Sequence, residues 1–329
     1  MLKNRCQPAR ISPNLSANLH VLLLGVLFGS SLVVSRFSVG QFLPREYVAL
    51  RLAIAALLHL SAYLLWSRRP WPRDLSLWLR AGLLGVVGSA LPMTAIVSSL
   101  QYQSSGVSGL LLTLNPVVVV LLAQFFLEDE PLTWNRLLGA LVAFGGAGLL
   151  LMRGESGLAE FARADWRGYA WIGVGVTASA SSSVYARRFL RHDDSFDVAT
   201  IRMVVAGLIT LGVVGANGGF HLARVGPSGV AALAYGSVIG AFLAFLVSLR
   251  IVQRFGATPL AQVSYVIPVM STILGALFLG EQVTGIMLVG MGVIFAGIAL
   301  LNHQPRKVQA QDEADLSAGL GRKASEPRG

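Results

Sequence analysis

The chain has 329 residues, of which 54% are hydrophobic and only 13% are charged. Soluble domains carry about 25% charged residues, so this composition excludes a globular surface that faces water on all sides. The single cysteine, Cys6, excludes an internal disulfide bond. Residues 81–127 contain no Asp, Glu, Lys or Arg, and about 20 apolar residues suffice for one transmembrane helix. We therefore expect an all-α, polytopic membrane protein.

The apolar segments, taken in chain order, predict ten transmembrane helices. A polar segment, residues 1–17, precedes the first of them and is expected in the cytoplasm. A cleaved signal peptide is the alternative for this start, but the first apolar segment is longer than a typical signal core. The polar tail, residues 303–329, is expected to be disordered and cytoplasmic. The predicted spans are 18–38, 46–67, 77–100, 105–127, 134–152, 168–188, 198–217, 229–250, 257–280 and 284–302.

The lysines and arginines are divided unevenly between the two predicted faces of the membrane. With a cytoplasmic N-terminus, 18 of the 26 fall on the cytoplasmic side and six on the other, while Arg51 and Arg202 fall inside spans. Cytoplasmic loops carry an excess of Lys and Arg, so both termini are expected in the cytoplasm of a multi-pass protein of the cell (inner) membrane. The same distribution accounts for the net charge of +10 without nucleic acid as a partner.

One sequence pattern occurs twice, with an offset of about 151 residues. It is a proline inside an apolar run, followed by a glutamate, a threonine and a glycine. Each copy lies in a group of five predicted helices, 18–152 and 168–302, joined by an extracytoplasmic linker, 153–167. Because five is odd, the second group enters the membrane from the opposite side, as in the inverted repeats of transporters that hold solute near the midplane. The two copies are Pro116, Glu130, Thr133 and Gly139, and Pro268, Glu281, Thr284 and Gly290.

These motifs resemble the EamA domain of the drug/metabolite transporter superfamily. The resemblance covers about residues 18–302, that is, both groups of helices, and Phe28 stands where the family often has tryptophan. The resemblance implies a ten-helix carrier of small organic metabolites, often an exporter, with one EamA-like repeat in each half. The strings that carry it are 98–107, Pro116 with Phe126-Leu127 and Glu130, Leu137-Leu138-Gly139-Ala140, and Pro268 with Phe278-Leu279-Gly280-Glu281 and Gly290.

Polar side chains near the middle of the predicted spans are candidates for contact with a solute. An amide or hydroxyl in the bilayer needs a hydrogen-bond partner, and either a neighbouring helix or a solute in a cavity can supply it. Pro116 and Pro268 each remove a backbone hydrogen bond and are expected to bend their helices, either to line the solute site or as packing kinks. The polar candidates are Ser30, Ser31, Asn115, Ser181, Ser182, Tyr185, Ser264 and Tyr265.

Four charged residues at or near the ends of spans are further candidates. Glu130 and Glu281 are interpreted as gate or ion-coupling carboxylates, or as interfacial residues beside the threonine that caps the next helix. Arg51 and Arg202 are interpreted as side chains that snorkel to the headgroups, or as counter-charges for an anionic solute.

The sequence also limits the energy source and the chemistry. No Asp or Glu falls at mid-span, which argues against coupling by a midplane carboxylate. No Gly-Lys dipeptide exists, so a Walker A phosphate loop is excluded. We expect neither a cofactor, a metal nor catalytic residues, because the nearest approach to a catalytic cluster is His192-Asp193-Asp194, an ordinary loop sequence.

The predicted function is therefore that of a secondary transporter rather than an enzyme. Its solutes are expected to be small organic metabolites such as amino acids, amines or drug-like compounds, and export by alternating access is the expected mode. A membrane-embedded transferase and a lipid flippase are the alternatives. The expected partners are a small-molecule solute and the lipid bilayer, and a homodimer is one of the oligomeric states that the sequence allows.

Overall fold

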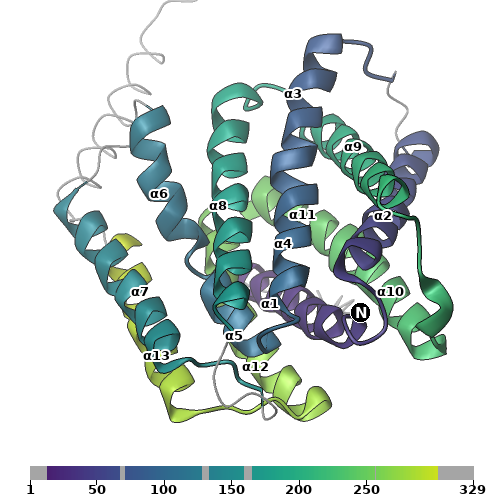
Figure 1. Ribbon diagram of the computed structural model, residues 1–329. Coiled ribbons are helices and arrows are strands. Elements are labelled where there is room, and N and C mark those ends of the chain that lie inside the picture. The colour runs from purple at the N-terminus through teal and green to yellow at the C-terminus, as the bar shows by residue number, and fades with distance from the viewer. Residues whose placement is uncertain (1–12, 67–70, 128–132, 159–164, 256, 303–329) are drawn as a thin grey trace, which may run out of the picture.

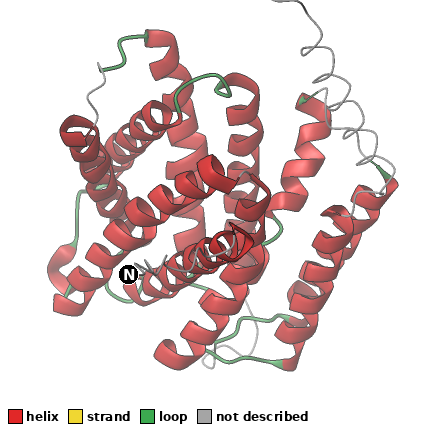
Figure 2. Ribbon diagram, turned by 180° about the vertical axis from the view of Figure 1, so that it is seen from behind, coloured by secondary structure: helices red, strands yellow, loops and turns green. Residues whose placement is uncertain are grey.

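The computed structural model describes residues 13–66, 71–127, 133–158, 165–255 and 257–302, which form helices and connecting turns without any strand (Figures 1 and 2). The expected all-α fold is thus confirmed for these residues, and the tail predicted to be disordered lies outside them. The elements are α1 Pro13–Ser38, α2 Pro44–Trp66, α3 Leu75–Gly85, η1 Val86–Ala90, α4 Leu91–Ser99, α5 Ser105–Leu112, α6 Asn115–Phe126, α7 Trp134–Arg153, α8 Trp166–Phe189, α9 Ser195–Ala216, η2 Leu222–Arg224, α10 Pro227–Ser237, η3 Val238–Leu243, α11 Ala244–Phe255, α12 Ala257–Leu279 and α13 Gly285–Asn302.

Nine helical segments of the described chain are long and apolar enough to cross a membrane. They coincide with nine of the ten predicted spans to within a few residues. The remaining prediction, 168–188, falls on α8, which has 24 residues but is rich in serine and alanine and ends on Arg187-Arg188. These residues keep α8 below the apolarity of the other nine, so its crossing of the membrane stays a prediction.

Side-chain caps fix several of the helix ends. Asp74, Ser104, Asp165 and Asp194 each adopt an extended backbone and accept hydrogen bonds from the first backbone N–H groups of α3, α5, α8 and α9. These N–H groups have no partner inside the helix, so a short polar side chain in this position stops the helix from extending backwards. At the other end of α7, Gly154 has φ = 64°, a left-handed conformation that glycine adopts without strain.

Two of the long helical segments contain a π-helical turn at equivalent positions. The segment from α3 to α4 passes through η1, and the segment from α10 to α11 passes through η3. The starts of η1 and η3, Val86 and Val238, are separated by nearly the same offset as the sequence repeat. A π turn holds more residues than an α turn and occurs often at functional sites. It also rotates the side chains that follow it about the helix axis. A prediction from regular α-helical periodicity therefore places these side chains on the wrong face.

The two prolines of the repeated pattern act differently on their helices. The helical segment 105–126 is interrupted at Thr113–Leu114, and α6 restarts at Asn115 with Pro116 in its first turn. Pro268, in contrast, lies inside α12, which continues through it without interruption. The expected bend is therefore realised as a break at the first proline, whereas a bend at the second stays a prediction.

The helices pack in pairs that join the two halves of the chain. α2 packs on α9, α1 on α12, α4 and α6 on α8, and α5 on α12. α7 and α13 form a separate pair at one edge of the bundle (Figure 1). In this pair a Cβ atom at Gly139 would lie 2.5 Å from the backbone nitrogen of Leu301. The glycine of the first sequence pattern is therefore required by close helix packing rather than by a ligand.

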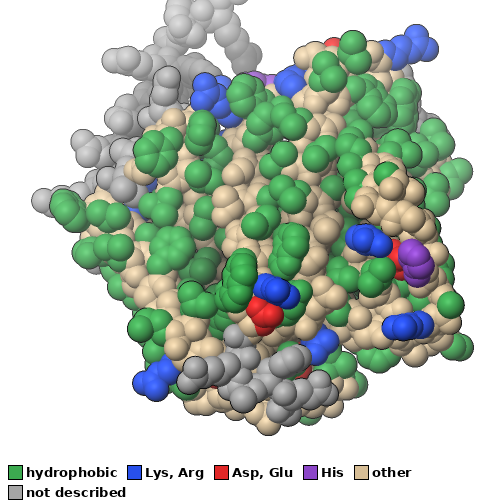
Figure 3. Space-filling view, in the orientation of Figure 1, with side chains coloured by type: hydrophobic (Ala, Val, Ile, Leu, Met, Phe, Trp, Pro, Cys, Tyr) green, Lys and Arg blue, Asp and Glu red, His purple; other side chains and the backbone are tan. Residues whose placement is uncertain are grey.

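The outer surface of the bundle is apolar. Hydrophobic side chains cover much of the face seen in Figure 3, and few charged side chains interrupt them. Large examples include Leu65 and Met152, both 88% exposed, and Trp134, 77% exposed. Soluble monomers rarely expose apolar surface on this scale. Together with the nine candidate spans, this surface identifies a multi-pass membrane protein.

Candidate functional site

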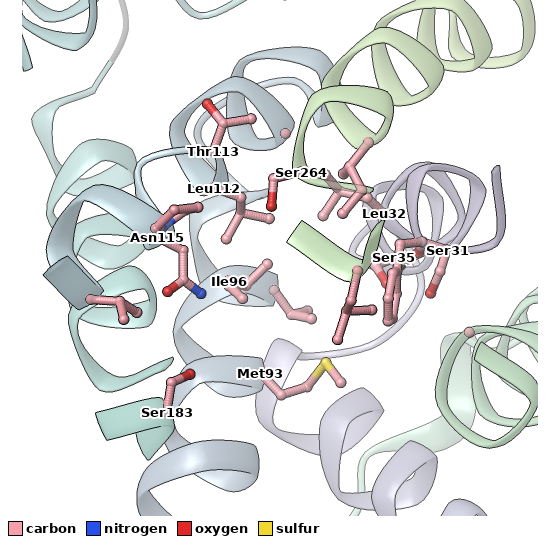
Figure 4. A pocket seen from close by; sticks show the side chains of 18 of the residues that line it. Ser31, Leu32, Ser35, Met93, Ile96, Leu112, Thr113, Asn115, Ser183 and Ser264 are labelled. Atoms are coloured by element: carbon pink, nitrogen blue, oxygen red, sulfur yellow. Dashed lines mark hydrogen bonds between the residues drawn. The ribbon is translucent and has the colours of Figure 1, made fainter. Parts of the chain in front are cut away.

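A cavity of about 720 Å³ lies inside the bundle, within the range of about 300–1,000 Å³ typical of small-molecule sites. Its wall is mainly apolar and includes Leu32, Met93 and Ile96 (Figure 4). Across the cavity in that view, Ser31 and Ser35 on one side face Asn115 and Ser183 on the other. The polar lining residues are Ser31, Ser35, Arg51, Thr113, Asn115, Ser183, Ser264 and Asn302.

Arg51 is the charged residue among the described lining residues of this cavity. It comes from α2 and is only 4% exposed. Its Nη1 donates to Ser35 Oγ and its Nη2 to Ser31 Oγ, both at 2.8 Å. Arg51 therefore does not snorkel to the headgroups, because two serines of α1 hold its guanidinium group inside the bundle.

Asn115 lines the cavity at the break between α5 and α6. Its Nδ2 donates to Ser179 Oγ on α8 at 2.8 Å, so the amide joins two helices and also borders the cavity. The sequence left these two roles as alternatives, and the structure combines them in one side chain.

Two residues of the cavity wall have a backbone carbonyl that lacks its usual helical hydrogen bond. A proline four residues later causes this loss in each case. Proline has no N–H, so the carbonyl four residues earlier loses its helical hydrogen bond. These residues are Leu112, before Pro116, and Ser264, before Pro268, and both line the cavity. In a membrane, such carbonyls are tolerated where they face a polar cavity or another partner. The two positions are 152 residues apart and come from different halves of the chain.

Two sequence candidates lie near the cavity but make other contacts. Ser30 Oγ donates to the carbonyl oxygen of Leu27 and forms a 2.9 Å hydrogen bond with the hydroxyl of Tyr235. Tyr265 accepts a hydrogen bond from Asn302 Nδ2 at 3.3 Å and packs against the ring of Phe295. Both side chains connect helices, and neither lines the cavity within the described part of the chain.

Three further candidates, Ser181, Ser182 and Tyr185, line a second pocket of about 440 Å³ among α3, α6 and α8. Arg188 and Phe126 border the same pocket, and Arg188 Nη1 donates to the carbonyl oxygen of Phe126 at 2.8 Å. The structure thus separates the serine-rich part of α8 from the main cavity, which receives only Ser183 from this helix.

Arg202 occupies the position in the second half that corresponds to Arg51 in the first. Its Nε donates to Ser89 Oγ at 2.6 Å, and its Nη2 donates to the carbonyl oxygen of Gly88, both in η1. It does not line either of the two pockets described above. The two equivalent arginines therefore have different surroundings, and only Arg51 borders the main cavity.

Glu281 joins the two halves of the chain. It is buried, and its carboxylate accepts hydrogen bonds from Ser105 N at 2.8 Å, Ser105 Oγ at 2.7 Å and Gly106 N at 3.3 Å. A carboxylate at this position complements the partial positive charge of the α5 N-terminus. Thr284 caps α13 through Met287 N, as expected. The corresponding candidate of the first half, Glu130, lies outside the described residues.

Ser35, Thr113 and Asn302 are polar lining residues that the sequence reasoning missed. Ser35 had a usable signal, because Ser31 and Ser35 are four residues apart and therefore share one face of a helix. Its hydroxyl donates to the carbonyl oxygen of Ser31 at 2.7 Å, which leaves its lone pairs directed to Arg51. Thr113 had no such signal, since its place follows from the break before Asn115.

The residues considered for metal binding or catalysis have the following surroundings in the described part of the chain. The described residues contain no cluster of three or more His, Cys, Asp or Glu side chains that could hold a metal ion. The loop sequence His192-Asp193-Asp194 has structural contacts: Asp193 forms an ion pair with Arg80 at 3.0 Å, and Asp194 caps α9. His192 accepts from Arg191 Nε at 2.8 Å.

A multi-pass helical membrane protein with an internal, solute-sized cavity is the architecture of a membrane transporter. The model of the EamA-like transporter family matches the chain twice, over residues 15–152 and 166–303. The chain therefore belongs to the EamA-like transporter family and contains two EamA repeats, which confirms the resemblance drawn from the sequence motifs.

Relatives of the chain include named transporters. A probable terminal-alkyne amino-acid exporter of Streptantibioticus cattleyicolor is 27% identical over 77% of this chain and 82% of its own. The inner membrane transporter YedA of Escherichia coli K12, described as uncharacterized, is 24% identical over 84% of this chain and 88% of its own. A chloroplastic WAT1-related protein of Arabidopsis thaliana is 26% identical over 79% of this chain, which spans only 63% of that protein. A solved crystal structure matches with a TM-score of 0.60 and 25% identity, over 89% of this chain and 98% of the other.

Proposed function

We propose that this chain is a secondary transporter in which two inverted five-helix repeats give access to the 720 Å³ cavity from alternate sides of the membrane. The observation that carries this proposal is that both repeats build the cavity. Ser31, Arg51 and Asn115 come from the first repeat, and Gly240 and Ser264 come from the second. A relative movement of the repeats would therefore change the site itself, as alternating access requires.

The packing partners of the helices support a pseudo-two-fold relationship between the repeats, and the odd number of spans proposed for each repeat would make this relationship an inverted one. α1 of the first repeat packs on α12 of the second, and its equivalent α8 packs on α6 of the first. The equivalent helices α2 and α9 pack on each other, as do α7 and α13. If each helix is replaced by its equivalent in the other repeat, every contact of this set becomes another contact of the same set. Two repeats related by a pseudo-two-fold axis have contacts of this kind. Ten spans, with α8 as the tenth, complete this arrangement.

The cavity has one end near residues expected in the cytoplasm. Leu260, Leu301 and Asn302 line it, and they lie near the start of α12 and the end of α13. At the opposite end, Glu281 binds the α5 N-terminus. These features support an inward-facing state with both chain termini in the cytoplasm, in which solute enters from inside for export.

The nature of the lining supports a small, amphipathic organic solute. Most of the wall is apolar, and hydroxyl and amide groups supply a few polar contacts. Few, well-placed polar groups within an apolar wall are typical of sites for small organic molecules. The relative described as a probable terminal-alkyne amino-acid exporter is consistent with solutes of this size.

Solute flux tests the proposed function directly. The full chain, reconstituted into liposomes, is expected to exchange at least one labelled solute from a panel of amino acids, amines, organic acids and drug-like compounds. Exchange should be saturable and independent of ATP, and an excess of the same unlabelled solute should compete with it. Liposomes without protein are the control, and absence of saturable exchange across the whole panel contradicts the proposal.

The inverted arrangement predicts opposite labelling of two equivalent loops. Gly40 follows α1 and His192 follows α8, and both residues are exposed. We expect Gly40→Cys to react with a membrane-impermeant thiol reagent added outside intact cells, and His192→Cys to react only after the cells are opened. Both variants are made with Cys6→Ser, which removes the native cysteine. Reaction of both sites from the same side would reject the inverted repeat.

A further inference from the structure

The guanidinium group of Arg51 is buried in the cavity wall and has no acidic partner among the residues that the structure describes. Its hydrogen bonds to Ser31 and Ser35 engage two nitrogens, and Nε has no partner within the described structure. The ring of Tyr47 lies beneath it, with the ring centroid 5.9 Å from Arg51 Cζ. The serine hydroxyls are neutral, so they orient the guanidinium group but leave its positive charge uncompensated.

An uncompensated charge at this depth is costly, because burial removes it from water. Ionisable residues inside membrane segments generally face a cavity or a partner and mark solute or ion pathways. A side chain that merely filled space would be replaced here by an apolar residue at no such cost. Arg51 borders the cavity, so an anionic group of a solute in the cavity would compensate this charge.

The surrounding helices leave room for this side chain. A Cβ atom at Gly240, in η3, would lie 3.0 Å from Arg51 Nη2, and one at Gly236 would lie 3.7 Å from Arg51 Cδ. A larger residue at Gly240 would clash first with the side chain of Ser31 and next with the guanidinium group, and so would disturb the hydrogen bond between them. The π turn of the second repeat thus provides the space in which the arginine of the first repeat stays buried beside the cavity.

Arg202, the equivalent arginine of the second half, makes contacts that fit a structural role. Arg202 donates to a backbone carbonyl oxygen and to a serine of one π turn, and it does not line the cavity. The two hydrogen bonds of Arg51 instead go to the cavity-lining hydroxyls of Ser31 and Ser35. The sequence repeat therefore explains why an arginine stands at both positions. Of these two arginines, only Arg51 lines the cavity.

We propose that Arg51, oriented by Ser31 and Ser35, is the specificity-determining residue that binds a carboxylate group of the transported solute. This inference rests on the proposed transport function and names the chemical group that the site recognises. A monoanion matches one guanidinium group, whereas a phosphate dianion would leave a charge uncompensated against the apolar wall. The rest of the solute lies along the apolar surface that includes Leu32, Met93 and Ile96.

Binding of an isosteric pair of compounds tests the inference independently of transport. Phenylacetate and phenylacetamide have the same size and differ in the charged carboxylate. Isothermal titration of the full chain in detergent is expected to show binding of phenylacetate and much weaker binding of the amide. Arg51→Gln should weaken phenylacetate binding by about 10- to 100-fold, because a hydrogen bond to a charged group is lost. Binding of the amide should not change.

Two further variants separate recognition from folding. Arg51→Lys keeps the charge but loses the two-pronged geometry, so it should restore part of the preference for phenylacetate. Arg202→Gln removes the equivalent arginine and should leave the preference unchanged. Thermal unfolding midpoints of all variants establish that the proteins are folded under the titration conditions.

Each other result overturns the inference. These results are equal affinity of the wild-type protein for the two compounds, no binding of phenylacetate at millimolar concentration, and unchanged phenylacetate binding in Arg51→Gln. None of these results contradicts the proposed transport function. Saturable flux of solutes without a carboxylate in the liposome panel would still support that function. Loss of flux for the whole panel would instead remove the proposed function.

Discussion

Replacement of Glu281 by glutamine is expected to loosen the contact between the Glu281 carboxylate and the start of α5, which we propose closes the extracytoplasmic side of the bundle. The carboxylate accepts three hydrogen bonds from Ser105 and Gly106, and it is buried. A glutamine side chain has one acceptor oxygen and an NH₂ group that cannot accept, so at least one donor of α5 is left unpaired. A hydrogen bond to a charged group contributes about 1.5–3 kcal/mol, enough to shift a two-state equilibrium by about tenfold or more.

Accessibility of Thr272 measures this opening. Thr272 is only 6% exposed and faces Gly106 across the contact between α5 and α12. With Cys6→Ser as background, Thr272→Cys should react slowly with an impermeant thiol reagent added from outside, and Glu281→Gln should raise the rate at least about tenfold. Asp165→Asn is the matched control, because the hydrogen bond that Asp165 makes within the described residues caps its own helix, through Arg167 N. An unchanged rate in Glu281→Gln would show that this carboxylate does not hold the outer end closed.

A disulfide bond between residues 106 and 272 is expected to stop transport completely and reversibly. A Cβ atom at Gly106 would lie 3.3 Å from Thr272 Cα and 2.9 Å from Thr272 Oγ1, so the side chains of cysteines at these two positions would be in contact. The bond would tie α5 to α12, that is, the first repeat to the second, in the observed arrangement. Alternating access requires these helices to separate on this side of the membrane, so the oxidised protein should be locked.

The measurement is solute exchange by the double variant Gly106→Cys with Thr272→Cys, again with Cys6→Ser. Exchange should fall to the level of empty liposomes after oxidation and return after reduction. The two single-cysteine variants control for the substitutions and should respond to neither treatment. Full exchange by the oxidised, verified disulfide form would exclude a movement between α5 and α12, and with it the alternating-access mechanism proposed here.

The helices and their approximate ends could be predicted from sequence, but the direction of each side chain could not. The apolar runs indicated the helices and their ends, because burial in lipid demands a minimum length of apolar chain. Ser31, Asn115 and Ser264 were expected near the cavity and line it. Ser181 and Ser182 were expected near the same cavity but face a second pocket, since the rotation of α8 depends on its packing against α4 and α6.

Arg51 illustrates a second limit of sequence reasoning. An arginine one turn into a span is expected to reach the headgroups when nothing inside the bundle can hold it. Here Ser31 and Ser35 bind it, and Gly240 leaves the necessary space, so the side chain turns inward. These three residues are distant in sequence or belong to a π turn, and only the folded arrangement brings them together.

The composition of α8 has a consequence for how the protein is assembled. Its many small and hydroxylated residues suit its contacts with α4 and α6 but make it a poor membrane segment by itself. Helices of this kind enter lipid less readily than leucine-rich ones. Stable insertion of α8 during synthesis should therefore depend on the helices of the first repeat being already in the bilayer, so that the first repeat acts as a template for the second.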